Sequence, residues 1–343
     1  MREARTPWRM VGVVAATTAI LMAAGCSDDS SDDTDTVSVE PLTGIDSPVA
    51  ATAPAGTITD SPSGMHSTTF DADTRSVVAL ADDYSSLLVF PVDATSDSVV
   101  PRVIELPGAA TSIADGRDGT VLLPTDKALL EVDLRTSGVD SIAVDARLLS
   151  AVELPDGQLA AGDDRGTVHV LGSDGSESHT ISGLTSVDSL ASTQYGLTAL
   201  DRHQTSLTEV KVDDDSLGLA LRAGEGAAEL DTDRFGRVLV TDAAGEELLV
   251  YSSESLLLRQ RFPVGAQPWA VAYDDNSDVV WISLPATNEV VGYTLDTGIP
   301  VEVSRFPTVR QPDSIAVDSD TGDLYIGSAT GDGLQRISVP GGQ

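Results

Sequence analysis

Gln267 to Ile282 reads QPWAVAYDDNSDVVWI, and Gln311 to Ile326 reads QPDSIAVDSDTGDLYI. Each stretch begins with Gln-Pro, continues as a short apolar run that ends in Asp, crosses a polar turn, and closes with an apolar run that carries an aromatic residue. Apolar runs rich in β-branched and aromatic residues, bounded by Asp, Asn and Gly, favour two strands joined by a tight turn. Because the two stretches lie 44 residues apart, the sequence indicates an array of repeats.

The same strand–turn–strand pattern recurs towards the N-terminus. Its first strands start at Ser67, Ser112, Ser150, Ser189, Glu229, Ala270 and Ser314. Third strands are expected at Leu87 to Val92, Ala128 to Leu134, Thr167 to Leu171, Ser206 to Val212, Glu247 to Tyr251, Glu289 to Leu295 and Leu334 to Val339. Units of about 40 residues match the four short strands of a β-propeller blade. We therefore expect an all-β fold, a seven-bladed β-propeller of four-stranded antiparallel blades.

The seventh unit is too short to hold four strands, because only 29 residues follow Ser314. An unpaired edge strand invites aggregation, so we predict that the N-terminal stretch Val37 to Ser63 supplies the missing outer strand. Gly56 to Asp60 (GTITD) is favoured, and Thr36 to Glu40 (TVSVE) is the alternative. The propeller is thus expected to span residues 56–343, with residues near 56–60 closing the last blade.

Residues 1–25 have the features of a targeting segment. Arg2, Arg5 and Arg9 form a basic start, Met10 to Ala24 is an apolar run too short for a stable membrane anchor, and small residues lead to the only cysteine, Cys26. The sequence MAAGC resembles the bacterial lipoprotein signal. That resemblance implies a lipid on Cys26, removal of the segment before it, and a protein anchored to the cell membrane on its extracytoplasmic face. The alternative is an ordinary secretory signal in which Cys26 is incidental.

Residues 26–55 are expected to form a tether between the lipid and the propeller. Ser27 to Thr36 reads SDDSSDDTDT and has no apolar residue, a composition that keeps a chain extended. The whole chain has 54 acidic and 20 basic residues, a formal net charge of −34. Such a surface repels phosphate, which excludes nucleic acid as a partner. We expect a monomer that meets the membrane through Cys26.

A family resemblance rests on the two C-terminal units. Val264 to Asp296 reads VGAQPWAVAYDDNSDVVWISLPATNEVVGYTLD, and it is similar to a blade of the YncE-like and NHL-type propellers, written roughly as vgxxPxxvaxdxxgxxlyvxxxxxxxvxvid. The second to fifth units lack the Pro of this pattern. With the lipoprotein signal, the chain resembles actinobacterial surface lipoproteins with a propeller body. The resemblance implies fold and location, and it implies function only weakly.

Motifs that would identify a reaction are scarce in this chain. We find no Gly-x-Ser-x-Gly elbow, no Walker-type Gly-Lys-Ser/Thr and no His-Glu-x-x-His, so we assign no catalytic residue and expect no cofactor. Asp318, Asp320 and Asp323 look like part of a calcium loop but lack the ordered ligands and terminal Glu of an EF-hand. We interpret them mainly as turn residues and keep calcium as a minor hypothesis.

Propellers usually bind ligands where the loops that enter the innermost strands converge. Those loops hold five candidate ligand-binding residues: His66, Gln267, Trp269, Gln311 and Asp313. Trp269 alternatively packs between the sixth and seventh blades. We therefore expect a binding or scaffold module for an unidentified protein, glycan or small molecule. The alternative is a lactonase-like hydrolase, which needs a metal or a cluster of His and carboxylate groups around the channel.

Overall fold

A computed structural model describes residues 38–93, 100–172 and 175–339. The expected signal segment, Cys26 and the acidic run at Ser27 to Thr36 lie outside these residues. All described residues belong to one compact unit. Among them, no helix is long and apolar enough to cross a bilayer.

Strands dominate the described residues and form six antiparallel sheets, five with four strands and one with seven. The four-stranded sheets contain β2 (Met65–Asp71), β3 (Ser76–Ala81), β4 (Ser86–Pro91) and β5 (Arg102–Glu105); β13 (Ser189–Thr193), β14 (Gly196–Asp201), β15 (Ser206–Lys211) and β16 (Ser216–Arg222); β17 (Ala227–Thr232), β18 (Arg237–Asp242), β19 (Glu247–Ser252) and β20 (Leu257–Pro263); β21 (Val271–Asp274), β22 (Val279–Leu284), β23 (Glu289–Thr294) and β24 (Val301–Pro307); and β25 (Pro312–Asp318), β26 (Asp323–Ser328), β27 (Leu334–Ser338) and β1 (Thr57–Thr59). The seven-stranded sheet contains β6 (Ala114–Asp115), β7 (Thr120–Pro124), β8 (Asp126–Asp133), β9 (Val139–Glu153), β10 (Leu159–Asp163), β11 (Thr167–Leu171) and β12 (Glu177–Ser182). A short 3-10 helix, η1 (Val212–Asp214), follows β15.

The seven-stranded sheet departs from the expected set of separate four-stranded blades. Its central strand β9 has 15 residues and pairs twice. The half that ends at Arg147 pairs with β8, and the half that begins at Leu148 pairs with β10. No Gly or Pro interrupts the sequence between Val139 and Glu153, so nothing breaks the strand where one unit ends and the next begins.

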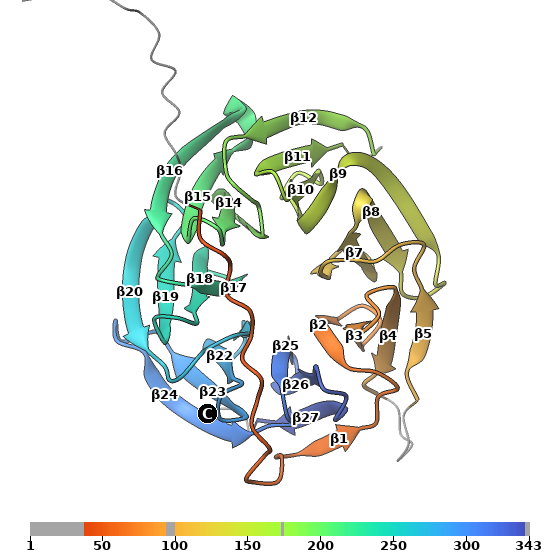
Figure 1. Cartoon of the computed structure of the whole chain (residues 1–343), viewed down its shortest axis with the longest axis vertical. Coiled ribbons are helices and arrows are strands. Elements are labelled where there is room, and N and C mark those ends of the chain that lie inside the picture. Colours follow the sequence, from red (N-terminus) through yellow and green to blue (C-terminus); the bar gives the residue numbers. More distant parts are fainter. Residues whose placement is uncertain (1–37, 94–99, 173–174, 340–343) are drawn as a thin grey trace, which may run out of the picture. The chain divides into compact units, whose positions relative to one another are not determined.

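The first strands of successive units follow one another around a central space (Figure 1). The contacts run from β2 to β6, β9, β13, β17, β21 and β25, and from β25 back to β2. This closed run of inner strands is the arrangement expected of a β-propeller.

The last sheet is completed from the N-terminal side of the chain. Strand β1 pairs antiparallel with β27, with Ile58 opposite Gln335, and it lies within the stretch Gly56 to Asp60 that the sequence favours. The described part of the alternative stretch, residues 38–40, lies elsewhere, where the backbone N–H of Val39 donates to the carbonyl of His203 at 2.8 Å. Strand β1 covers the edge that β27 would otherwise expose.

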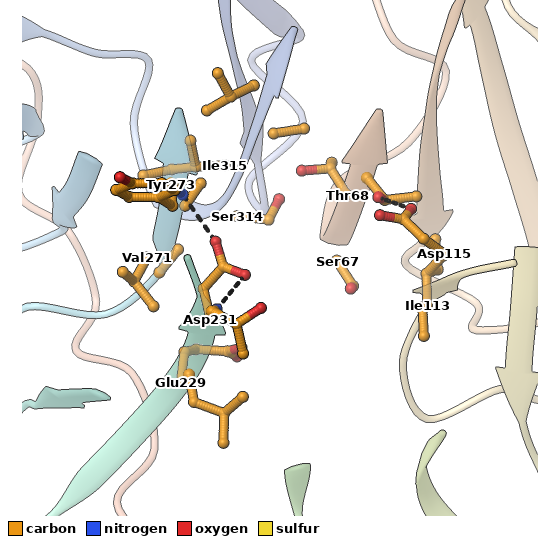
Figure 2. A pocket seen from close by; sticks show the side chains of 18 of the residues that line it. Ser67, Thr68, Ile113, Asp115, Glu229, Asp231, Val271, Tyr273, Ser314 and Ile315 are labelled. Atoms are coloured by element: carbon orange, nitrogen blue, oxygen red, sulfur yellow. Dashed lines mark hydrogen bonds between the residues drawn. The ribbon is translucent and has the colours of Figure 1, made fainter. Parts of the chain in front are cut away.

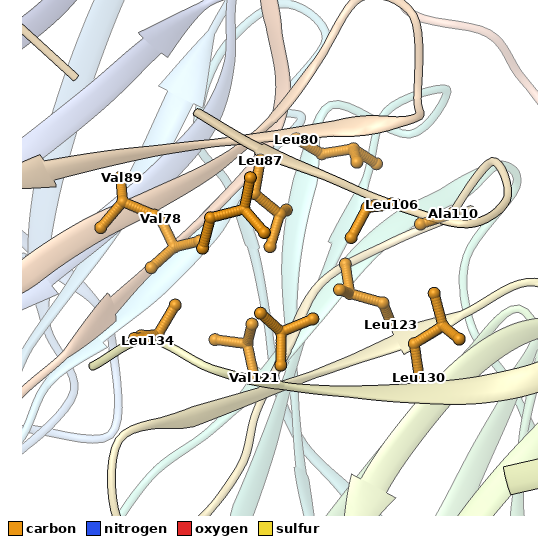
Figure 3. Packing of buried hydrophobic residues seen from close by; sticks show 12 residues of the cluster. Val78, Leu80, Leu87, Val89, Leu106, Ala110, Val121, Leu123, Leu130 and Leu134 are labelled. Carbon is orange, nitrogen blue, oxygen red and sulfur yellow. The ribbon is translucent and has the colours of Figure 1, made fainter. Parts of the chain in front are cut away.

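Apolar side chains from neighbouring sheets pack face to face. In the cluster of Figure 3, Val78 and Leu87 of one sheet meet Val121 and Leu130 of the next, all almost completely buried. Successive side chains of a strand point to opposite faces, so the continuous apolar run of β3 supplies Val78 and Leu80 to this cluster and Val77 and Ala79 to the cluster on its other face. The space between sheets therefore forms the hydrophobic core.

Trp281 is among the largest fully buried side chains of the described residues. It lies opposite Gly292 in the β22–β23 pair. A Cβ atom at position 292 would lie 2.7 Å from Cζ3 of Trp281, closer than two carbon atoms approach. The absence of a side chain at Gly292 therefore leaves room for the indole ring of Trp281 in the core.

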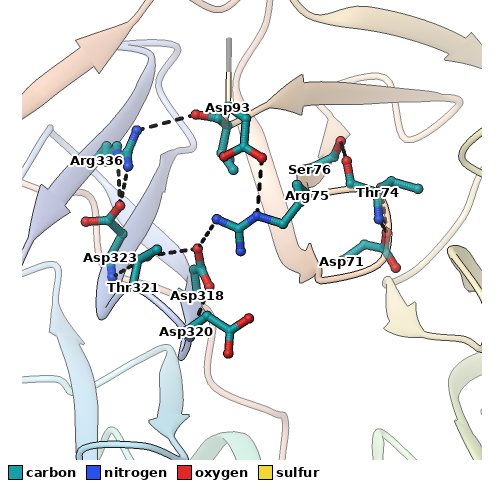
Figure 4. Close-up of polar contacts among 11 residues, drawn as sticks. Asp71, Thr74, Arg75, Ser76, Asp93, Asp318, Asp320, Thr321, Asp323 and Arg336 are labelled. Carbon is teal, nitrogen blue, oxygen red and sulfur yellow. Dashed lines mark hydrogen bonds and ion pairs between the residues drawn. The ribbon is translucent and has the colours of Figure 1, made fainter. Parts of the chain in front are cut away.

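Aspartates at the ends of first strands hold the hairpin turns (Figure 4). The carboxylate of Asp318 accepts hydrogen bonds from the backbone N–H of Asp320 at 3.1 Å and from the hydroxyl of Thr321 at 2.8 Å, as expected of a hairpin tip. It also lies 2.7 Å from the guanidinium of Arg75 in the neighbouring sheet, and Asp323 is paired with Arg336. Guanidinium groups thus pair with Asp318 and Asp323, two of the three carboxylates of the calcium hypothesis.

Candidate ligand site in the central cavity

The inner strands enclose a cavity of about 500 Å³ (Figure 2). Strands β2, β13, β17, β21 and β25 each stand at the edge of a sheet. An edge strand has a row of backbone N–H and C=O groups without a sheet partner. The inner strands therefore offer polar backbone groups to the central cavity in addition to their side chains.

Five carboxylates from four inner segments line the cavity: Asp115, Glu229, Asp231, Asp275 and Asp313. His66 is the only basic side chain among the described lining residues. The rest of the lining is small, hydroxylic or aliphatic, apart from Phe70 and Tyr273. The cavity is thus rich in hydrogen-bond acceptors and carries an excess of negative charge.

Asp231 is held at the channel wall by two backbone groups. Its carboxylate accepts hydrogen bonds from the N–H of Thr232 at 2.7 Å and from the N–H of Tyr273 at 2.8 Å. The second bond joins β17 to the free edge of β21 (Figure 2). Burial nevertheless outweighs the two hydrogen bonds and raises the pKa of Asp231 to about 7, with smaller increases from the charges of Asp115 and Asp275.

Glu229 lies two residues before Asp231 on the same strand. Its side chain is open to the channel but surrounded by protein. This burial raises the pKa of Glu229 to about 7, because the nearby charge of Arg202 compensates only in part and Asp313 adds a repulsion. The cavity therefore contains carboxyl groups that are partly protonated near neutral pH.

The variant Glu229→Gln is expected to change stability in a pH-dependent way. The pKa of Glu229 rises from 4.5 to about 7 on folding, so the contribution of the glutamate is fully favourable below pH 4.5 and is lost as the pH rises through 7. At pH 8 the free energy of unfolding of the variant should therefore be about 1 kcal/mol higher than that of wild type. This figure is discounted because solvent in the channel screens the charge of Glu229. At pH 4.5 the two chains should be similar. Urea titrations at both pH values measure the difference.

The exposed residue Glu254, in the turn between β19 and β20, provides a matched control. The variant Glu254→Gln should have the same small effect at both pH values. If Glu229→Gln shifts the urea midpoint equally at pH 4.5 and pH 8, the carboxyl group is not the cause.

Two of the five sequence candidates line the cavity, namely His66 and Asp313. Nε2 of His66 lies 3.1 Å from a carboxylate oxygen of Asp82, and its ring stacks on Tyr84 with centroids 4.8 Å apart. Asp313 accepts a hydrogen bond from the amide of Gln311 at 2.8 Å. Burial raises the pKa of Asp313, while Gln311 and His66 act in the opposite direction.

The other three candidates lie outside the described lining. The amide of Gln311 is buried against the N-terminal segment, where it binds Ile45 and Ser47. Trp269 packs at the edge of the core cluster of the sixth and seventh units, which is the alternative that the sequence left open, and Arg202 lies over its ring at 5.6 Å. Gln267 is half-buried, with a left-handed φ of 51°.

Sequence reasoning missed four lining carboxylates, Asp115, Glu229, Asp231 and Asp275. A signal was present at Glu229 and Asp231, which place acidic groups two residues apart in a first strand where the other units are mostly apolar or hydroxylic. Among the described residues, no three His, Cys, Asp or Glu side chains are placed to share a metal ion. The carboxylates are instead distributed around the wall.

The comparison with solved structures decides the fold. The chain is similar to hydrazine synthase from Kuenenia stuttgartiensis, with a TM-score of 0.70 and 12% identity over 85% of this chain and 100% of that chain. It is also similar to a streptogramin B lyase structure, with a TM-score of 0.66 and 12% identity over 83% and 96% of the two chains. These structures are β-propellers. The chain has a β-propeller fold.

A chain of the mitotic checkpoint complex, a WD40 assembly, matches this propeller equally well, with a TM-score of 0.70 and 12% identity over 87% of this chain and 99% of that chain. No protein-family model matches the sequence, and no curated protein matches it. Such low identity shows the fold alone, because propellers host many unrelated functions.

Proposed function

We propose that this protein is a lipid-anchored, extracytoplasmic, seven-bladed β-propeller of the YncE-like or NHL type that acts as a binding or scaffold module at the cell surface. The seven-blade count is supported by the closed run of seven first strands, in which β9 serves both as the fourth strand of one blade and the first strand of the next. The location is supported by the MAAGC sequence that ends at the only cysteine, Cys26.

The central cavity carries the binding proposal. Its volume of about 500 Å³ is that of a small-molecule site. Carboxylates and the free edges of inner strands provide acceptors from several blades at once, so they favour a ligand with several hydrogen-bond donors, such as a glycan or a peptide loop. Glu229 and Asp313, which repel each other electrostatically in the cavity, are the side chains we assign to recognition.

A thermal-shift screen of the full chain with sugars, peptides and metal ions identifies the ligand class. Titration calorimetry then compares wild type with the double variant Glu229→Gln and Asp313→Asn. We expect at least a tenfold loss of affinity, about 1.4 kcal/mol, because both carboxylates lose their charge. The exposed change Asp332→Asn should leave affinity unchanged. Equal affinity of the double variant and wild type would place the ligand elsewhere.

The variant Cys26→Ser tests the anchor. Lipid attachment requires the thiol, so the variant should lose incorporation of labelled palmitate and move from the membrane fraction to the soluble fraction. If wild-type protein is instead found in the soluble fraction without lipid, the alternative of an ordinary secretory signal would be supported. The propeller itself should keep its melting temperature in both chains.

The second candidate function is that of a hydrolase, and the position of His66 at the cavity favours it. A histidine held by Asp82 at 3.1 Å and open to a cavity with several carboxyl groups has the surroundings of a general base. Lactone and ester substrates are assayed with wild type and His66→Asn. A loss of 10² or more in rate is expected for a general base, whereas a wild-type rate equal to the buffer background excludes this function.

A further inference from the structure

Residues 38–55 form an extended segment, called here the strap, that has neither helix nor strand. The strap passes from beside β15, along β17, to β1 (Figure 1). It contributes no residue to the described lining of the central cavity. The contacts of the strap therefore define a second surface, which adjoins the ligand site proposed above at Gln311, because the amide of Gln311 also donates to Asp313.

Side chains of the propeller bind the main chain of the strap. The amide of Gln311 donates to the carbonyl of Ile45 at 2.8 Å and accepts from the N–H of Ser47 at 2.7 Å. Arg310 donates to the carbonyl of Ser47 at 3.0 Å, and Asn288 donates to the carbonyl of Pro48 at 2.9 Å.

The same mode of contact extends towards both ends of the strap. Arg202 donates to the carbonyl of Leu42, and Gln335 donates to the carbonyl of Ala55 at 2.7 Å. Amide and guanidinium side chains thus take the place that a neighbouring strand takes in β-augmentation.

One position of the strap is restricted in size. Ser47 is 2% exposed, and its hydroxyl donates to the carbonyl of Pro285 at 2.7 Å, so a larger side chain has no room there. Gly44 lies against the indole of Trp269, whose ring atoms are 3.7 to 3.8 Å from the position of an added Cβ, so this position accepts a methyl group in ordinary contact. The surface therefore selects an extended peptide with a small residue at the position of Ser47, followed by proline.

We propose that this surface is a peptide-binding track, occupied here by the chain's own strap, that also accepts an extended Ser-Pro peptide from another molecule when the strap is displaced. The Trp269 and Gln311 side chains, which do not line the cavity, are the centre of the track. Covalent connection gives the strap an effective concentration in the millimolar range or above. The strap therefore excludes a free peptide from the wild-type chain.

The test uses the full chain with residues 41–48 replaced by a Gly-Ser linker of equal length, which leaves β1 in place. A labelled peptide of residues 41–50 (PLTGIDSPVA) is titrated against this chain and wild type by fluorescence anisotropy. We expect the linker chain to bind the peptide at least tenfold more tightly than wild type. The change Gln311→Ala in the linker chain should abolish that gain.

A control peptide with arginine in place of serine (PLTGIDRPVA) should not bind, because the pocket around Ser47 is closed. Two results with a folded linker chain would overturn the proposal. One is that the chain does not bind the first peptide at millimolar concentration, and the other is that it binds both peptides equally. If the linker chain does not fold, the point variant Ser47→Arg in the full chain replaces it, with the same expected gain and the same contradicting results.

Discussion

Deletion of residues 27–60 is expected to lower the melting temperature by roughly 10 °C or more, the shift that several kcal/mol produce in a domain of this size. The deletion removes β1 and leaves β27 as an open edge next to β26. It also removes the strap, so the amides of Gln311 and Gln335, 8% and 0% exposed, lose partners that they bind in the folded chain. Each hydrogen bond lost in this way contributes about 0.5–1.5 kcal/mol to stability.

Two shorter deletions separate these contributions. A chain without residues 27–36 retains the strap and β1 and should melt close to wild type. A chain without residues 27–50 loses most of the strap but keeps β1, and it should melt between the other two. A melting temperature unchanged by the 27–60 deletion, measured by differential scanning calorimetry, would show that the propeller does not depend on its N-terminal closure.

The variant Arg75→Met is expected to destabilise the propeller by about 3 kcal/mol at pH 7, the usual cost of leaving a buried charge unpaired. Asp318 is 1% exposed, and Arg75 reaches it from the first sheet across the junction with the last (Figure 4). Burial acts to raise the pKa of Asp318, but the hydrogen bonds from Arg75 and Thr321 outweigh it and hold the pKa below 3.8.

The pH dependence of this effect has a definite sign. A carboxyl whose pKa is lowered by folding contributes stability that is present above the unfolded pKa of about 3.8 and is lost as the pH falls through the folded value. The gap between wild type and Arg75→Met in urea titrations should therefore narrow below pH 3.8. The variant Arg305→Met, which removes partly exposed pairs with Glu289 and Glu302, should cost less than about 1 kcal/mol. Equal losses for the two variants would contradict the role of the sheet junction.

Local patterns in the sequence predict most of the fold. Third strands such as Thr167 to Leu171 and Glu289 to Leu295 lie within a residue of their observed bounds, because an alternating run between turn residues specifies a strand locally. The incomplete seventh unit directs attention to Gly56 to Asp60, where β1 lies. The single long strand β9 was not predicted. In the sequence, one strand shared by two units differs from two separate strands only in that no Gly or Pro interrupts it.

The candidate site was harder to predict, since it depends on which residues of distant units meet. His66 and Asp313 lie at the start of inner strands and reach the cavity, as the loop argument requires. Trp269 has the position of Asp313 in its own unit, and Gln311 lies two residues before Asp313, but the strap contacts both. No periodicity indicates where a segment without regular structure will lie, so neither the strap nor its partners could be assigned from sequence.

A crystal structure of the full chain with the compound that gives the largest thermal shift tests the central claim most directly. Our account predicts that the compound lies in the central cavity, within hydrogen-bond distance of Glu229 or Asp313. A compound bound on the outer strands, with the cavity unoccupied, would contradict it.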